Sequence, residues 1–146
     1  MKIIRNLDVL HPILKDCVKK IQSEIINTHD VPMKLFETGR LHDRQEMLLN
    51  KGKTQTAISK HVFNLENDPP LYATATDYVY FDNKWSWNLR NSTILSWYIL
   101  FGNMVLDLCP ELIWHGVNRK NINYCHFELR SDIILHNLRK YPCVVY

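Results

Sequence analysis

The fold is decided by the stretch Tyr72–Phe81, which reads YATATDYVYF. Its side chains alternate between two faces, as those of a β-strand do, and its β-branched and aromatic residues favour a strand. One face holds Ala73, Ala75, Asp77, Val79 and Phe81, and the other holds Tyr72, Thr74, Thr76, Tyr78 and Tyr80. We therefore expect a strand that carries a carboxylate, Asp77, beside small residues that leave room around it.

Hydrophobic periodicity outlines the elements around this strand. Helices are expected at 12–27, 43–50, 92–108 and 132–139, with Ser92 as a cap and Pro110 as a stop. Further strands are expected at 31–37, 112–114 and 124–129. Helices on one side of a small antiparallel sheet make an α+β fold. We expect one domain over residues 1–146.

Composition and charge indicate a globular protein and argue against nucleic-acid-binding and membrane-spanning classes. The chain has 146 residues, is 46% apolar and 23% charged, and has a net charge of +3. Because no stretch is densely basic, we expect no nucleic-acid partner. No apolar run is long enough for membrane insertion, and the N-terminus lacks the apolar core of a signal peptide. The four cysteines form no CxxC pair, so a structural cysteine-zinc site is not expected, and they are too few for a disulfide scaffold. We expect a monomer that is made in the cytoplasm with free thiols.

The segment Tyr124–Leu129, YCHFEL, indicates the chemistry. On a strand, His126 shares a face with Tyr124 and Glu128, so it can face a cleft while its neighbours enter the core. His61 and Asp77 add a second imidazole and a carboxylate. Two histidines and a carboxylate form the ligand set of a catalytic zinc site whose fourth position holds water. Spacing alone leaves the alternative open that these are ordinary surface or hydrogen-bonded histidines.

Several short motifs, which occur in the same order as in a known family, strengthen the prediction of a zinc site. Ser59-Lys60-His61, Ala75–Val79 and His126–Leu129 resemble the zinc-binding motifs of the D-alanyl-D-alanine carboxypeptidase and L-alanyl-D-glutamate peptidase family, most closely its phage endolysin branch. The likeness runs from about Leu10 to Leu129. It includes Leu10-His11-Pro12, Thr38-Gly39-Arg40, Gln45, Gly52-Lys53-Thr54, Trp85–Asn88 and Ile113–Gly116.

The resemblance implies a hedgehog/DD-peptidase-like fold and one zinc ion bound by His61, Asp77 and His126. Arg40 would hold the carbonyl oxygen as negative charge develops on it. Ser59 would position the substrate or His61, and Gln45 would contribute to substrate binding. The substrate would be a peptide bond of a peptidoglycan stem peptide beside a D-amino acid. The protein would then act at the cell wall after release from the cytoplasm.

Asn123 departs from the family, which has an acid as general base at this position. An amide cannot accept the proton of water, and loss of a general base typically costs about 10²- to 10⁴-fold in rate. Three alternatives stand: an engineered change, a natural zinc-binding pseudoenzyme, or another acid in the same role. Glu128 is a candidate for that acid, although a supporting position is favoured for it. The function is a weakened zinc peptidase, or else an inactive relative that binds cell-wall peptide or a protein.

Smaller departures concern the cleft. The segment between His61 and Asp77 is longer than in the family, and the surplus at Leu65–Leu71 would be a loop that reshapes the cleft. His115 is expected to be a plain loop histidine and Cys125 to turn toward the core. Trp85 and Trp87 are candidates for exposed contacts with sugar, whereas Trp97 is expected in the core.

Overall fold

The computed structural model describes residues 2–54, 56, 59–118, 120 and 122–143. Within them, a five-stranded antiparallel sheet has the order β1-β2-β5-β4, and β3 pairs with β2. The strands are β1 (Met33–Glu37), β2 (Ala75–Asp82), β3 (Lys84–Ser86), β4 (Leu112–Trp114) and β5 (His126–Leu129). The expected strand is thus confirmed as β2, which begins at Ala75 rather than Tyr72 and pairs with β1, β3 and β5.

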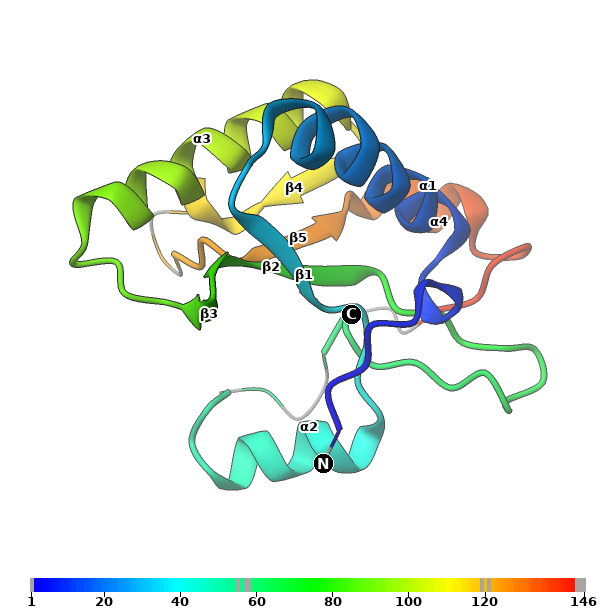
Figure 1. The fold of residues 1–146 in the computed structure, drawn as a ribbon. Helices are drawn as coiled ribbons and strands as arrows, with labels where there is room; N and C mark the ends of the chain where they lie inside the picture. The colour runs from blue at the N-terminus through cyan, green and yellow to red at the C-terminus, as the bar shows by residue number, and fades with distance from the viewer. Residues whose placement is uncertain (1, 55, 57–58, 119, 121, 144–146) are drawn as a thin grey trace.

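The helical layer lies over one face of this sheet (Figure 1). It contains α1 (Pro12–Lys20), its π-helical continuation η2 (Ile21–Asn27) and α3 (Ser92–Leu108), and α4 (Ser131–Asn137) follows β5. Short 3₁₀ turns, η1 (Leu7–Val9) and η3 (His115–Val117), precede α1 and follow β4. The expected α+β class is confirmed. α2 (His42–Asn50) lies apart from this layer, on the opposite side of the sheet in Figure 1.

The helices bury apolar stripes, and the expected cap of one of them is corrected. The buried stripe of α1 and η2 comprises Leu14, Cys17, Val18, Ile21 and Ile25. α3 is capped by Asn91 rather than Ser92, because the Asn91 Oδ1 accepts hydrogen bonds from the N–H groups of Thr93 and Ile94. Its buried residues are Tyr98, Phe101, Gly102 and Val105, while Ile99 is exposed.

Trp114 fixes the edge of the sheet beneath α3. Its ring stacks on Phe127, and its Nε1 donates a hydrogen bond to the carbonyl oxygen of Tyr124 at 3.0 Å. A Cβ added at Gly102 or Gly116 would lie 2.3 or 2.1 Å from this ring. The indole therefore fits only because both flanking residues are glycine. This packing holds β4 against β5, the strand that begins with His126.

Three local expectations differ from the structure. β3 was not expected, because its three residues are too short to show periodicity. Tyr124 and Cys125 form a turn before β5 rather than its first residues, so strand alternation does not govern Cys125. The loop at Leu65–Leu71 closes on itself through backbone hydrogen bonds between Asn64 and Leu71. Among the described helices, none has the length and apolarity needed to cross a membrane.

Candidate metal centre

Cross-strand pairing places three polar side chains in one row. Asp77 on β2 pairs with His126 on β5 and with Glu37 on β1, after a bulge in β1 between Leu35 and Glu37. Directly paired residues on one face of a sheet have neighbouring side chains. The register of three strands therefore brings Asp77 and His126 together without any help from loops.

His61 comes from a loop that is tied to the segment after β1. The Arg40 N–H donates to the carbonyl oxygen of His61 at 2.7 Å, and the Phe63 N–H donates to that of Arg40 at 3.2 Å. Gly39 makes this approach possible, since a Cβ there would lie 2.7 Å from the Phe63 ring. The Ser59 Oγ accepts a hydrogen bond from the His61 N–H at 3.2 Å. Ser59 thus positions His61, one of its two expected roles.

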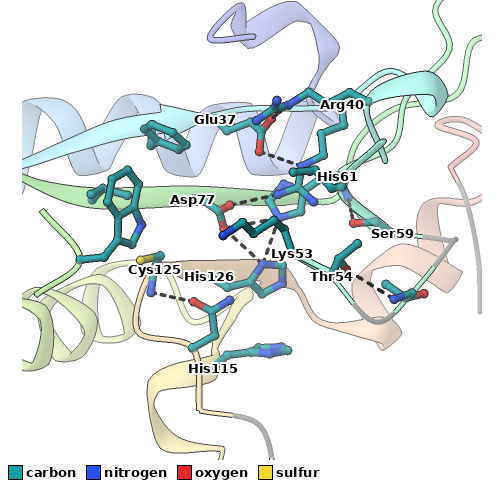
Figure 2. Close-up of a pocket in the computed structure, with 17 residues that line it drawn as sticks. Glu37, Arg40, Lys53, Thr54, Ser59, His61, Asp77, His115, Cys125 and His126 are labelled. Carbon is teal, nitrogen blue, oxygen red and sulfur yellow. Dashed lines mark hydrogen bonds and ion pairs between the residues drawn. The ribbon is translucent and has the colours of Figure 1, made fainter. Parts of the chain in front are cut away.

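The three expected ligand residues converge on one point (Figure 2). The His61 Nε2 lies 3.0 Å from the His126 Nδ1, and these nitrogens lie 3.4 and 3.3 Å from the Asp77 Oδ1. Ligand atoms at zinc–ligand distances of about 2.0–2.2 Å in a tetrahedron are about 3.3–3.5 Å apart. The triangle therefore has the dimensions of one face of a zinc coordination sphere.

The polar atoms inside this triangle are poorly satisfied by the protein itself. The Asp77 Oδ1 is buried and has no hydrogen-bond partner among the described residues, although two imidazole nitrogens face it. Burial of an unpaired carboxylate oxygen is costly, and a bound cation would remove that cost. The donor set and the unpartnered oxygen both fit a zinc ion at this point.

Electrostatics at the triangle favour charge on the carboxylate. Burial alone would raise the pKa of Asp77, but the nearby imidazoles of His61 and His126 outweigh it and hold that pKa well below its usual range. Burial lowers the pKa of His61, against the attraction of Asp77. Burial also opposes protonation of His126, yet the nearby carboxylates of Asp77 and Glu128 raise its pKa to about 9. Asp77 is therefore held ionised beside both rings.

The other nitrogen of His126 faces a closed network. Its Nε2 lies 2.8 Å from the Glu128 Oε2, while the Lys60 Nζ donates to the Glu128 Oε1 at 2.6 Å. The His115 Nε2 lies 3.3 Å from the Glu128 Oε2. His115 is therefore part of the centre, contrary to the expectation of a plain loop histidine. A carboxylate that accepts from one imidazole nitrogen fixes the other as the metal-binding atom.

Arg40 is held at the side of the triangle by three partners. Its Nε donates to Glu37 at 2.8 Å, its Nη1 donates to Gln45 at 3.0 Å, and its Nη2 lies 3.4 Å from the Asp77 Oδ2. Glu37 is buried and also accepts from the Arg44 Nε at 2.8 Å. Gln45 is fully buried behind Arg40 and does not line the cleft. Its contacts are with Arg40 and with the Thr56 carbonyl oxygen, to which its Nε2 donates at 2.8 Å, so it supports two parts of the cleft wall from behind.

The triangle opens into a cleft of about 820 Å³. Its other described walls come from β1, α2, the loop after α2 and the segment before β5, and include Phe36, Arg44, Leu48, Lys53, Trp87, Asn123 and Cys125. Cys125 lines the cleft and also packs against the core, so the expectation that it turns toward the core holds in part. No residue of Leu65–Leu71 lines the cleft, so that loop does not reshape it.

The two candidate tryptophans differ. Trp87 is 51% exposed and lines the cleft. Trp85 packs edge-on against Phe36 and Phe81, with the Arg5 guanidinium over its ring. Trp85 thus supports the cleft wall, while Trp87 offers an open face. Trp97 packs against the core, as expected.

Asn123 lies at the mouth of the cleft and is exposed. Its Oδ1 accepts a hydrogen bond from the Cys125 N–H at 3.1 Å, and its own N–H donates to the His115 carbonyl oxygen. The amide therefore shapes the turn that precedes His126. Its Nδ2 can donate a hydrogen bond but cannot accept a proton.

Reasoning from the sequence missed Glu37, Arg44 and Lys60. Lys60 lies between Ser59 and His61 in a motif already singled out, which was the available signal for it. Glu37 ends a strand just before Thr38-Gly39-Arg40, but its pairing with Asp77 depends on a bulge that the sequence does not reveal.

Comparison with solved structures finds a similar fold. The L-Ala D-Glu endopeptidase ChiX of Serratia marcescens superposes with a TM-score of 0.62 at 24% sequence identity, covering 94% of this chain and 88% of that one. The likeness shows that the two proteins share a fold. No protein-family model matches the chain, and a search of curated proteins finds no match.

Proposed function

We propose that this protein is a zinc-dependent peptidase of the phage endolysin type that hydrolyses peptide bonds in peptidoglycan stem peptides, weakened by Asn123. One observation carries the proposal: the His61 Nε2, Asp77 Oδ1 and His126 Nδ1 lie within 3.0–3.4 Å of one another at the wall of an open cleft. The shared fold with an L-Ala D-Glu endopeptidase supports it.

Each residue of the centre has a distinct role within this proposal. His61, Asp77 and His126 would hold the zinc ion, which when bound supplies a Lewis acid and lowers the pKa of a bound water. Glu128 orients the His126 ring so that its Nδ1 faces the centre. Arg40, fixed by Glu37 and Gln45, presents its guanidinium beside Asp77, where it can stabilise the negative charge of a carbonyl oxygen.

Proton transfer is the weak step. Asn123 can orient a water molecule through its Nδ2 but cannot take the proton. Glu128 is not placed to replace it, because it bonds the far nitrogen of His126 and is already held by Lys60 and His115. We therefore expect hydrolysis about 10²- to 10⁴-fold slower than with a carboxylate at position 123.

Restoring the carboxylate tests the proposal. The unaltered protein, Asn123→Asp and Asn123→Glu would each be incubated with zinc and purified peptidoglycan, and released peptides would be identified by mass. At least one acidic variant should cleave at least about tenfold faster than the unaltered protein. The double variant Asn123→Asp, His61→Ala is the matched control and should be inactive. Full-rate cleavage by the unaltered protein would contradict the role given to Asn123.

The second candidate function is a zinc-holding binding module for cell-wall peptide. It is favoured by the Asn123 Oδ1, which is engaged with Cys125 rather than free for chemistry. Calorimetry with a purified stem peptide, with and without zinc, measures this function. Zinc-dependent binding together with no cleavage by either acidic variant would establish the module and overturn the peptidase.

A further inference from the structure

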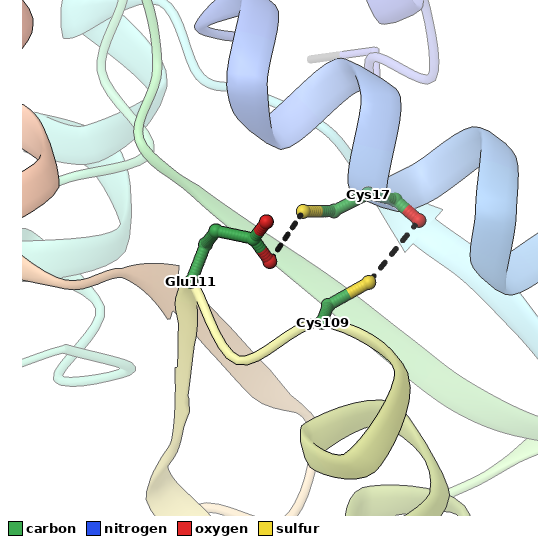
Figure 3. Close-up of side chains that lie close together, drawn as sticks. All are labelled: Cys17, Cys109 and Glu111. Carbon is green, nitrogen blue, oxygen red and sulfur yellow. Dashed lines mark hydrogen bonds between the residues drawn. The ribbon is translucent and has the colours of Figure 1, made fainter.

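A second group of metal-ligating side chains lies under the helical layer, away from the cleft. Cys17 comes from α1, Cys109 follows the last turn of α3, and Glu111 precedes β4 (Figure 3). Their ligating atoms all lie within 4.8 Å of one another. Three donors from two segments that lie more than 90 residues apart in sequence, α1 and the connection between α3 and β4, thus point into one small space.

The contacts within this group are long and weak. The Cys17 Sγ donates to the Glu111 Oε2 at 3.8 Å, and the Cys109 Sγ donates to the backbone oxygen of Cys17 at 3.9 Å. A sulfur and an oxygen ligand on one tetrahedral zinc ion, at about 2.3 and 2.1 Å from it, lie about 3.6 Å apart. The spacing suits ligands of a common ion better than it suits strong hydrogen bonds.

Burial and charge add to this geometry. Both thiols are buried, at 3% and 0% exposure, and Glu111 is half-buried. The pKa of Cys17 is raised by its hydrogen bond with Cys109, by burial and by the negative charge of Glu111, whereas Lys20 acts in the opposite direction. A carboxylate beside two buried thiols gains little from them, but a cation would bind all three.

We propose that Cys17, Cys109 and Glu111 bind one thiophilic divalent cation such as zinc, separate from the centre in the cleft. Binding releases the two thiol protons to solvent, and the half-buried side of Glu111 leaves the fourth position to water. Two thiolates and one carboxylate exceed the ion's charge by one, and the positive charge of Lys20 favours ionisation of both thiols. The ion would join α1 to the connection between α3 and β4, and so stabilise the fold rather than take part in hydrolysis.

Sulfur distinguishes this site from the cleft, whose ligands are nitrogen and oxygen. The protein would carry Cys125→Ser and Cys143→Ser, so that Cys17 and Cys109 are its remaining thiols. Titration with cadmium ion would be followed by thiolate-to-metal charge-transfer absorption. We expect one equivalent to saturate this band, the band to persist with His61→Ala, and the melting temperature to rise with bound ion.

Two further variants make the titration decisive. Cys109→Ser should remove the two-thiolate band. Glu111→Gln keeps both thiols and should weaken cadmium binding at least about tenfold while the circular dichroism spectrum is unchanged. The absence of a band in a folded protein with two titratable thiols would overturn the proposal. A thiol count of zero in the isolated protein would also overturn it, because the two cysteines would then be joined as a disulfide. Equal cadmium affinity in Glu111→Gln and in the protein with Glu111 would overturn it as well.

Discussion

The two nitrogen atoms of His126 face opposite kinds of surroundings. On the Nε2 side, Glu128 is matched by Lys60 and His115, so the charges are balanced by the protein. On the Nδ1 side, His61 and Asp77 approach with their acceptor atoms, and the Asp77 Oδ1 is left without a hydrogen bond. Both sides offer three ligand-type residues, yet on the Nδ1 side the nearest described cation, Arg40, meets the Asp77 Oδ2 at 3.4 Å and leaves the Asp77 Oδ1 unpaired.

This contrast separates a metal-binding side from a supporting side. A carboxylate that already accepts from a lysine at 2.6 Å gains little from a further cation, whereas a buried carboxylate oxygen without a donor gains much. Substitutions on the two sides should therefore affect zinc binding to very different extents. The predictions below are ordered by that expected extent, and each uses the protein with its cleft otherwise intact.

The largest effect is expected from His61→Ala on the Nδ1 side. This change removes one of three protein ligands, so the cleft should no longer hold zinc through dialysis. Metal analysis by mass spectrometry, with Cys17→Ser and Cys109→Ser in the background, counts only the cleft ion. Retention of one full equivalent of zinc in the altered protein would show that the metal sits on the other side of His126.

A smaller effect is expected from Glu128→Gln. The amide keeps the shape of the side chain but loses the charge that orients the His126 ring, and changes of this kind cost about 10- to 100-fold in metal affinity. Competition with a chromophoric chelator measures the zinc affinity. Complete loss of zinc, as in His61→Ala, would mean that Glu128 is itself a ligand and that the supporting side has been misassigned.

The sequence predicts these two sides unequally. Alternation along Tyr72–Phe81 and the short motifs pointed to His61, Asp77 and His126, and the structure brings these three together, while their role as ligands stays a prediction. A supporting position was favoured for Glu128, but its contacts with Lys60 and His115 were not foreseen, for a physical reason. Lys60 and His115 reach Glu128 from loops 68 and 13 positions away in sequence, and no periodicity encodes such a meeting. Cys125 was assigned to a strand because alternation was extended beyond the first residue of β5.

Lys60→Met tests the charge balance on the Nε2 side. The alkyl chain is kept, but the cation that holds the Glu128 Oε1 is lost. Because this pair is partly exposed, its contribution is small, and zinc affinity should fall by up to about tenfold. The chelator assay used for Glu128→Gln gives the value. A loss larger than that of Glu128→Gln would place Lys60 in contact with the metal or its water rather than behind Glu128.

The smallest effect is expected from His115→Asn. Its contact with Glu128 is longer, at 3.3 Å, and Lys60 and His126 keep their own bonds to that carboxylate. Zinc affinity should change by less than about threefold, within the range of a partly exposed polar contact. The double variant with Lys60→Met separates the two supports. If Lys60 and His115 hold Glu128 independently, the losses of zinc-binding free energy from the two substitutions add. A combined loss equal to that of Glu128→Gln shows that the two residues together account for the orientation of Glu128.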